Sequence, residues 1–476
     1  MDEARVSRIV AQVVEQLRQD GGLSSRGSGP LIQRQRPSSI GGQGIHQSID
    51  RAVASAEESF RALRDCSLEA RSAFIEAMRR ETRSILPQLA RDAVSESGLG
   101  RVDDKIAKNQ LVADKTPGVE ALRPLADSGD HGLTLTEWAP YGVIGSITPC
   151  TNPTETILNN GIGMIAAGNS VVFNVHPKAK RLSAFFIDRL NQAISSAGGP
   201  PALLNCVDEP TIQSAEELMK HPGVRLLVVT GGGGVVKAAM ASGKRAIAAG
   251  PGNPPVLVDE TADITQAARD IVFGASLDNN IICIVEKEII AVAEIADQLK
   301  RSLLQSNAVE VRGAGLRRLE KLLITPDNHV NRDFIGKDAA LILAEAGIRA
   351  PESTRIAFAE VEESHPFVQH EMLLPVLGFV RVPNVDEGIR CALRVEHGYG
   401  HTAVMHSSDI RALHRYASSA NTSIFVKNAP SAAGVGLRGE GFTSWTIASP
   451  TGEGMTYAPH FARARRCVLK DAFRIV

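Results

Sequence analysis

The sequence predicts an α/β protein in which two doubly wound domains, each a parallel sheet covered by helices on both faces, follow one another. The chain has 476 residues, more than one ordinary domain holds. From about Tyr141 onward, short apolar segments alternate with helical segments, a pattern typical of parallel sheets. Hydrophobic residues make up 43% of the chain and charged residues 22%, so the composition is that of a folded protein.

Charge and hydropathy exclude several classes of protein. Lys and Arg number 52 against 53 Asp and Glu, so the chain has no basic field for nucleic acid or an anionic membrane. No apolar run reaches the roughly 20 residues of a membrane span, and the acidic N-terminus is not a secretory signal. Six cysteines are scattered without a C-x-x-C pair, which indicates neither a disulfide framework nor a metal site. We expect a soluble cytoplasmic protein.

Residues 1–20 are predicted to form an amphipathic helix. Apolar residues recur on one helical face at Val6, Ile9, Val10, Val13, Val14 and Leu17. The Gly/Ser-rich stretch that follows predicts a flexible linker over residues 21–43. A helix on such a tether either folds back onto its own domain or docks into a groove on a partner.

The body of the chain begins with helices, in which Ile49, Val53, Ala56, Phe60 and Leu63 follow helical spacing. Buried strands are then predicted at 142–148, 170–175, 202–207, 224–230 and 255–259, and a second series at 288–293, 401–407 and 422–427. Helices are predicted between them, for example over 155–168 and 181–195. We expect one domain over 44–245, a second over 246–430, and a return segment over 431–476.

Cys283 is the first candidate for chemistry. It follows the turn-like Asp278-Asn279-Asn280 and precedes an acid–base pair, Glu286 and Lys287, and a strand. A thiol at a loop edge near polar groups can have a lowered pKa and act as a nucleophile. The alternative, which the local pattern by itself favours, is an inert buried cysteine.

Two loops that lead from a strand into a helix are further candidates. Asn152, in ITPCTNPTET (147–156), can donate its amide to a developing oxyanion; the alternative is an ordinary helix-capping turn. The segment TGGGG (230–234) places glycines where backbone amides can approach a phosphate. Its strict G-x-G-x-x-G spacing is absent, so this signal alone is weak.

Taken together, these motifs resemble the aldehyde dehydrogenase superfamily across nearly the whole chain. The resemblance rests on the order of the Asn152 loop, the glycine-rich turn, AAGPGNPPVLVD (248–259), NNIIC-x-x-EK and HEMLLPVLGF (370–379). The chain is most similar to the CoA-acylating branch, namely the propionaldehyde and acetaldehyde dehydrogenases of bacterial microcompartments. Further support comes from EHGYGHTAVMHS (396–407), PTGEGMT (450–456) and the terminal RRCVLKDAFRIV.

The resemblance implies a role for each matching position. Cys283 matches the catalytic cysteine, and Asn152 matches the oxyanion-hole asparagine that acts with the backbone N–H of Cys283. Glu371 matches the glutamate that contacts the nicotinamide ribose. The remaining positions expected to bind the cofactor are Thr148, Pro149, Asn174, His176, Thr230, Gly231 and Gly232. The resemblance also implies that domain 44–245 binds NAD or CoA, that domain 246–430 is catalytic, and that the C-terminal segment is an oligomerisation arm.

Two departures from the family pattern are informative. Hydrolytic members carry a glutamate that activates water, whereas this chain has Gly250-Pro251-Gly252-Asn253 at that place. A lysine that grips the adenosine ribose is replaced by Asn174. Both changes fit a site that protects a thioester from water and admits CoA.

The expected reaction is the oxidation of a short-chain aldehyde, propionaldehyde first, to its acyl-CoA with NAD+ and coenzyme A through a Cys283 thioester. His397 and His401 are candidates for the base that deprotonates CoA, and a structural role is an equal alternative. Ile281 and Ile282 resemble the propionaldehyde enzymes, but one or two methylenes are worth only ~1–3 kcal/mol of discrimination. Acetaldehyde therefore stays open.

Rival functions are a hydrolytic aldehyde dehydrogenase that releases the free acid and a non-catalytic scaffold in which only the N-terminal helix matters. The resemblance implies that residues 1–20 bind a microcompartment shell protein, so that the enzyme lies inside the compartment. It also implies a homodimer or homotetramer. Nucleic acid, membrane and metal are not expected partners.

Overall fold

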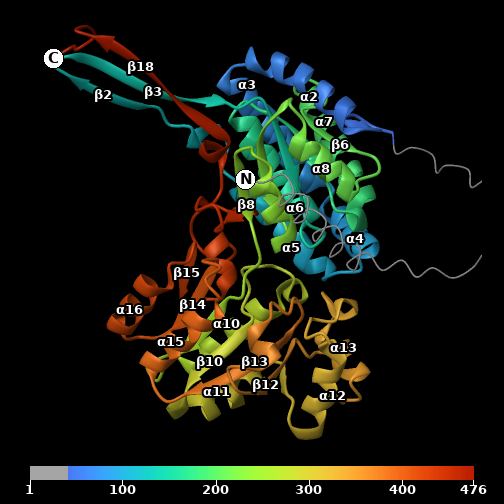
Figure 1. Cartoon of the computed structure of the whole chain (residues 1–476). Helices are drawn as coiled ribbons and strands as arrows, with labels where there is room; N and C mark the ends of the chain where they lie inside the picture. The colour runs from blue at the N-terminus through green and yellow to red at the C-terminus, as the bar shows by residue number, and fades with distance from the viewer. Residues whose placement is uncertain (1–40) are drawn as a thin grey trace, which may run out of the picture. The chain divides into compact units, whose positions relative to one another are not determined.

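The computed structural model describes residues 41–476 (Figure 1). The predicted helix 1–20 and nearly all of the linker 21–43 lie outside the described residues. The chain divides into two compact units. The first contains the chain up to Ile85 together with Thr116–Ala249 and Thr456–Val476, and the second contains Leu86–Lys115 and Gly250–Met455. The units are therefore interleaved along the sequence, whereas the expected domains are unbroken stretches.

The first unit is built on a parallel sheet of six strands in the order β1-β6-β5-β4-β7-β8. Every residue of β4, β5 and β6 is buried, as expected for a parallel sheet with helices on both faces. The strands are β1 (Ile45–His46), β4 (Val143–Ile147), β5 (Ser170–Asn174), β6 (Leu204–Val207), β7 (Val224–Thr230) and β8 (Ala246–Ala249).

Helices pack around this sheet and begin at side-chain caps. Ser48 accepts a hydrogen bond from the Arg51 amide at the start of α2, and Thr211 caps α8 in the same way. The helices are α2 (Ile49–Arg64), α3 (Leu68–Ser84), α6 (Pro153–Ala166), α7 (Lys180–Ser196), α8 (Ile212–Lys220) and α9 (Gly233–Ala241), with short 3₁₀ turns η1 (Val119–Ala121), η2 (Pro177–Ala179) and η6 (Ala458–Phe461).

A three-stranded antiparallel arm extends from the first unit, with the C-terminus at its far end (Figure 1). It consists of β2 (Leu125–Gly129), β3 (Gly132–Pro140) and β18 (Ala462–Lys470), with β3 in the middle. Every residue of the edge strand β2 is exposed. Strand β18 lies within the C-terminal segment 431–476, which the resemblance suggested for the arm, and its pairing with β3 starts at Ala462. The sequence analysis did not anticipate β2 and β3.

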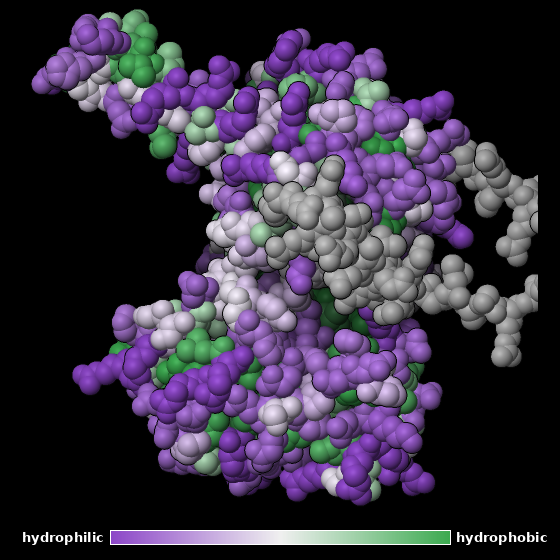
Figure 2. Space-filling model, in the orientation of Figure 1, coloured by the Kyte–Doolittle hydropathy of each residue, from purple (hydrophilic) through white to green (hydrophobic). Residues whose placement is uncertain are grey.

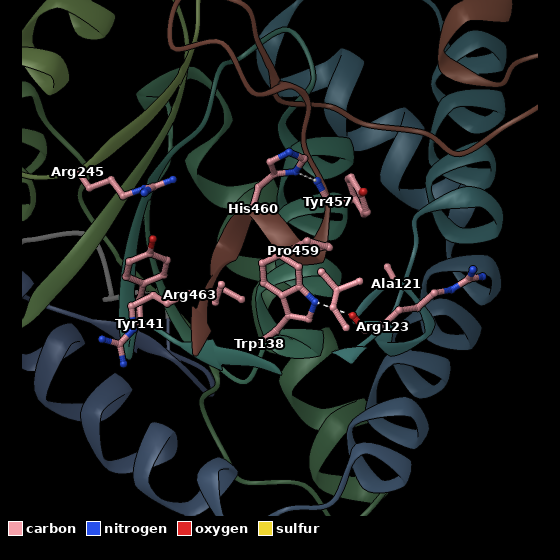
Figure 3. A pocket seen from close by; sticks show the side chains of 12 residues that line it. Ala121, Arg123, Trp138, Tyr141, Arg245, Tyr457, Pro459, His460 and Arg463 are labelled. Atoms are coloured by element: carbon pink, nitrogen blue, oxygen red, sulfur yellow. Dashed lines mark hydrogen bonds between the residues drawn. The ribbon is translucent and has the colours of Figure 1, made fainter. Parts of the chain in front are cut away.

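A cavity of about 790 Å³ lies in the first unit at the base of this arm (Figure 3). The guanidinium groups of Arg245 and Arg463 lie 5.8 and 6.0 Å from the ring centroid of Tyr141. Trp138 donates its indole N–H to the carbonyl of Arg123 on another wall. None of the candidate site residues lines this cavity, so the predicted chemistry lies elsewhere.

The second unit is built on a parallel sheet of seven strands in the order β11-β12-β13-β10-β9-β14-β15. The strands are β9 (Pro255–Val258), β10 (Glu288–Val292), β11 (Ala308–Glu310), β12 (Ile356–Glu360), β13 (Val376–Val382), β14 (Thr402–His406) and β15 (Ile424–Lys427), and a small antiparallel pair is formed by β16 (Ile447–Ala448) and β17 (Gly454–Met455).

Helices of this unit come from both of its chain segments. They are α4 (Leu86–Ser97), α5 (Val102–Lys115), α10 (Ile264–Ser276), α11 (Ala293–Gln305), α12 (Gly313–Leu323), α13 (Ala339–Glu345), α14 (Pro366–Gln369), α15 (Val385–Val395) and α16 (Ile410–Ala420), with 3₁₀ turns η3 (Leu277–Asn280), η4 (Arg332–Phe334) and η5 (Ser431–Val435). Each segment predicted as a strand contains an observed strand, and the predicted α/β class with parallel sheets is confirmed. No helix of the described residues is long and apolar enough to cross a membrane.

A buried ionic cluster joins α5 to the turn η3. The Asp278 carboxylate accepts from Lys105 Nζ at 3.0 Å and Lys108 Nζ at 2.5 Å, and also from the Arg101 amide at 2.8 Å. All three side chains are buried. Burial alone raises the pKa of Asp278, but Lys108, Lys105 and these hydrogen bonds hold that pKa below its ordinary value. The carboxylate therefore stabilises the fold above the ordinary aspartate pKa, and this stabilisation is lost as pH falls through the folded-state pKa.

Replacing Asp278 with asparagine (Asp278→Asn) is expected to lower the free energy of unfolding by about 3–5 kcal/mol, because it takes the carboxylate away from two buried ammonium groups. Urea unfolding followed by circular dichroism measures this loss. The control is Asp386→Asn, which removes an exposed ion pair with Arg415 and is expected to cost less than about 1 kcal/mol. Equal losses of unfolding free energy in the two variants would contradict the larger stabilisation expected from the buried cluster.

Candidate active site

The candidate cofactor residues of the first unit gather at one edge of its sheet. The chain runs from β4 outward through β5 and β6 on one side and continues through β7 and β8 on the other. The strand order therefore reverses between β4 and β7, and open α/β sheets bind ligands at the carboxyl ends of the strands at such a point. The residues that follow these ends are Thr148 and Pro149 after β4, Asn174 and His176 at the end of β5, and Thr230, Gly231 and Gly232 after β7.

The glycine-rich turn after β7 has the features of a phosphate site. Gly231 donates its amide to the Ala249 carbonyl at 3.2 Å, and Gly232 is the N-cap of α9. A Cβ at Gly232 or Gly233 would meet nothing within 4 Å, so the first turn of this helix is open. The hydroxyl of Thr148, buried at the end of β4, has no hydrogen-bond partner among the described residues. Free amides at a helix N-terminus and a spare hydroxyl fit the pyrophosphate of a dinucleotide.

Asn174 and His176 have local bonds of their own. Asn174 Oδ1 accepts from the Ser214 hydroxyl at 2.6 Å, which ties the end of β5 to α8. His176 Nδ1 accepts from the Lys178 amide at 3.1 Å, and burial together with the charge of Lys178 lowers the pKa of His176 to about 4. Both residues thus shape the edge of the sheet, and their direct contact with a cofactor stays a prediction.

Asn152 occupies the N-cap position of α6 without capping it through its side chain. Its carbonyl accepts from the amide and hydroxyl of Thr156, at 3.1 and 2.7 Å. Its side-chain amide donates to the Thr151 hydroxyl at 3.1 Å. The helix-capping alternative for this side chain is therefore not what the structure shows.

In the second unit, Cys283 follows a turn of unusual backbone geometry. Asp278, Asn279 and Asn280 have φ values of 49°, 53° and 67°, a region that residues other than glycine rarely adopt. Cys283 itself is half-buried, whereas Cys206 and Cys391 are fully buried. Burial and the Glu371 charge raise the pKa of the Cys283 thiol to about 12, and the Lys287 charge acts in the opposite direction.

Glu371, from the segment between α14 and β13, lies beside the turn 250–253. Its Oε1 accepts from the Gly252 amide at 3.2 Å. Burial raises the pKa of Glu371, while the charge of Lys287 and the Gly252 amide lower it. The structure thus brings Glu371 into the electrostatic environment of Cys283, and its predicted contact with a nicotinamide ribose stays a prediction.

The turn 250–253 has no room for a side chain where it approaches the nucleophile. A Cβ at Gly252 would lie 2.8 Å from the Cys283 carbonyl oxygen and 2.9 Å from Cγ of His401. Asn253 is buried and donates to the carbonyls of Val368 and Val395, each at 2.9 Å. The segment in which hydrolytic relatives carry a water-activating glutamate is therefore packed backbone here.

The two candidate histidines differ sharply in their surroundings. His397 is exposed and donates from Nε2 to the Gln369 carbonyl at 3.0 Å, which gives it a structural task. His401 is fully buried, its Nδ1 lies 2.9 Å from the Thr402 hydroxyl, and its Nε2 has no partner among the described residues. Burial and the charge of Lys287 lower the pKa of His401 to about 4. A neutral imidazole with a spare nitrogen suits a proton acceptor.

The sequence did not predict that Lys287 holds the turn before Cys283 through buried hydrogen bonds. Its ammonium is buried and donates to the Asn280 carbonyl, the Asn280 side-chain oxygen and the Ile282 carbonyl, at 2.7, 2.7 and 3.2 Å. A charged residue four positions after the cysteine, at the start of an apolar strand, was the available signal.

Comparisons with known proteins identify the family of this chain. The model of the aldehyde dehydrogenase family matches residues 42–317. The acetylating acetaldehyde dehydrogenase EutE of Salmonella typhimurium is 50% identical over 448 residues, which cover 93% of this chain and 96% of that protein. A crystal structure of Rhodopseudomonas palustris propionaldehyde dehydrogenase with bound propionyl-CoA superposes with a TM-score of 0.90 at 47% identity, covering 91% of this chain and 96% of the other.

A propionaldehyde dehydrogenase from the fucose utilisation microcompartment of Clostridium phytofermentans is similar to the same degree, with a TM-score of 0.90 and 45% identity over 91% of this chain and 100% of the other. Its solved variants include one with a cysteine and one with a histidine replaced by alanine. Those two positions are separated by the same number of residues as Cys283 and His401. On the match of family model, sequence and structure, the chain belongs to the aldehyde dehydrogenase family.

Proposed function

We propose that this chain oxidises a short-chain aldehyde to its acyl-CoA, with NAD+ as oxidant and coenzyme A as acyl acceptor, through a thioester on Cys283. The observation that carries the proposal is the packing of Gly252 between the Cys283 carbonyl and the His401 ring. It leaves no room for a side chain at this point of the turn beside the nucleophile and brings a neutral imidazole close to it. A site of this kind favours attack by a thiol over attack by water.

The first half of the reaction forms the thioester. The Cys283 thiolate attacks the aldehyde carbonyl carbon, and the oxyanion accepts hydrogen bonds from the Cys283 backbone amide and from the Asn152 side-chain amide, the role that the family resemblance assigns to it. NAD+, when bound, accepts the hydride that leaves the thiohemiacetal carbon. The start of α9 at Gly232 and Gly233, which follows Gly231, and the Thr148 hydroxyl are the groups that would hold its phosphates, because they offer an open helix N-terminus and a spare hydroxyl at the switch point of the sheet.

The second half transfers the acyl group to CoA. His401 Nε2 takes the proton from the CoA thiol, the resulting thiolate attacks the thioester carbonyl, and Cys283 leaves as a thiolate. The lowered pKa of His401 keeps the imidazole neutral in the neutral range, and its Nε2 has no other hydrogen-bond partner among the described residues. His397, fastened to the Gln369 carbonyl on the surface, has no part in this step.

Propionaldehyde and acetaldehyde are the substrates that the relatives favour. The similar proteins are an acetylating acetaldehyde dehydrogenase and propionaldehyde dehydrogenases. Ile281 and Ile282, which suggested propionaldehyde from the sequence, are both buried against the core. Because a methylene changes discrimination by only ~1–3 kcal/mol, we propose that both aldehydes are used, with propionaldehyde preferred.

The antiparallel arm is proposed to join a second copy of the chain, as a homodimer or homotetramer. Its edge strand β2 is exposed and leaves backbone groups free for pairing. Apolar residues are exposed on the arm and at its end, and Figure 2 shows hydrophobic surface gathered there. They are Leu125, Val468, Phe473, Ile475 and Val476.

The reaction is tested by NADH formation from propionaldehyde and NAD+ with and without CoA. Sustained turnover is expected only with CoA, and Cys283→Ala is expected to abolish it because no thioester can form. Cys66→Ala, a change of another half-buried thiol, is the matched control and keeps full activity. Equal turnover without CoA would identify a hydrolytic enzyme, and no turnover with any short aldehyde would favour a scaffold.

His401→Ala is expected to separate the two half-reactions. The first turnover still releases NADH from wild-type enzyme and variant alike, whereas steady-state turnover with CoA falls about 10²–10⁴-fold, the usual contribution of a general base. Stopped-flow absorbance resolves the burst from the steady state. His397→Ala is the control and stays close to wild type. Loss of the burst in His401→Ala would place this histidine in the first step instead.

Residues 1–20 are proposed to direct the enzyme into a microcompartment by binding a shell protein. The support is the amphipathic pattern of this segment and the microcompartment origin of a similar enzyme. Deleting residues 1–20 is expected to leave turnover unchanged and to abolish co-purification with shell proteins. Lost turnover in the truncated enzyme, or undiminished co-purification, would contradict the proposal.

A further inference from the structure

The turn before the nucleophile is held in a costly conformation. Three consecutive residues other than glycine, Asp278, Asn279 and Asn280, lie in the left-handed region, which is unfavourable for them unless the surrounding structure holds it. Two buried residues, Ile281 and Ile282, separate the end of this turn from Cys283. The position of the thiol therefore depends on the groups that hold the turn.

Lys287 is the group that holds the side of the turn nearest to Cys283. Its ammonium donates all three of its hydrogens, to the Asn280 carbonyl and side-chain oxygen and to the Ile282 carbonyl. The ammonium is buried, so these bonds are shielded from water. Asn280 in turn donates its side-chain amide to the carbonyls of Ala275 and Glu286, at 2.7 and 2.9 Å. Lys287, which follows Cys283 in the chain, is thus bonded to Asn280 and Ile282, which precede it, and so holds the segment that carries the nucleophile.

The charge of the same ammonium lowers the pKa of the Cys283 thiol, against burial and the Glu371 charge, which raise it. The groups that interact with Lys287 electrostatically are Glu371, Cys283, Glu288 and Glu286. Burial raises the pKa of Glu286 to about 7 and that of Glu288 well above its ordinary value, so these two carboxyls offset the lysine less than ionised groups would. Burial lowers the pKa of Lys287 to about 8, which leaves it charged at neutral pH.

We propose that Lys287 is the positioning residue of the nucleophile: it holds the left-handed turn through the oxygens of Asn280 and Ile282, and its charge stabilises the Cys283 thiolate. The proposal rests on the proposed function in that it takes Cys283 as the nucleophile. Its first readout, the reactivity of the thiol itself, does not need aldehyde, NAD+ or CoA. A failure of the proposed reaction is therefore distinguishable from a failure of this inference.

The test measures the rate at which iodoacetamide alkylates Cys283 in the full chain from about pH 6 to about pH 10, which spans the Lys287 pKa of about 8. Peptide mass spectrometry distinguishes this cysteine from the other five. Lys287→Met is expected to slow alkylation at pH 7 by about tenfold or more, and the wild-type rate is expected to fall toward that of the variant as Lys287 loses its charge. A tenfold change corresponds to about 1.4 kcal/mol of lost thiolate stabilisation. Lys287→Arg, which keeps the charge, is expected to restore most of the rate.

Lys300→Met is the matched control. Lys300 is another buried lysine of the same unit, paired with Glu360 and Glu310 away from the turn. Its replacement also removes a buried ammonium group but is expected to leave the alkylation profile of Cys283 unchanged. Steady-state kinetics add a second readout, because Lys287→Met is expected to lower kcat while the KM for the aldehyde changes little.

If Lys287→Met does not fold, as judged by circular dichroism, Lys287→Gln takes its place, since its amide retains a donor for the loop carbonyls and removes only the charge. An unchanged alkylation profile in a folded Lys287→Met or Lys287→Gln variant overturns the proposal. The same holds if Lys300→Met shifts the profile as much as the Lys287 variants do.

Discussion

The buried charges around the left-handed turn 278–280 are the interaction on which the candidate site depends. On one side, Lys105 and Lys108 from α5 hold the Asp278 carboxylate. On the other side, Lys287 at the start of β10 holds the oxygens of Asn280 and Ile282. The left-handed backbone conformation of residues 278–280 is unfavourable, and it persists only because the surrounding groups hold it. Cys283 therefore owes its position to one ionic group close to it in sequence, Lys287, and to two that are distant, Lys105 and Lys108.

The arrangement around Cys283 explains how one protein fold can carry out acyl transfer to a thiol. Hydrolysis of a thioester needs a base that activates water, and the backbone of Gly252 fills the place beside the Cys283 carbonyl instead. The adjacent imidazole of His401 is buried, and burial keeps it neutral with one free nitrogen. The lack of room for a side chain at Gly252 and the retention of a neutral imidazole follow from the same close packing.

The two sheets support different sets of candidate site residues. The six-stranded sheet places loops with open amides at a switch point, a general solution for binding dinucleotides. The seven-stranded sheet supports the nucleophile turn, Glu371 and His401. The arm formed by β2, β3 and β18 carries exposed edge and apolar groups that contribute nothing to either sheet, which is consistent with a role in assembly.

The sequence by itself determined the α/β class, the positions of the buried strands and the identity of the family. Apolar runs and their spacing are local properties, and the motifs around Asn152, Cys283 and Glu371 carry the resemblance. The tertiary structure alone decided which charged residues are buried, since Lys105 and Lys108 look like exposed helix residues until Asp278, distant in sequence, is placed against them. It likewise distinguished His401 from His397, and it grouped Leu86–Lys115 with the second unit. Burial of a charge depends on partners that only the folded chain brings together, and for that reason local pattern cannot reveal it.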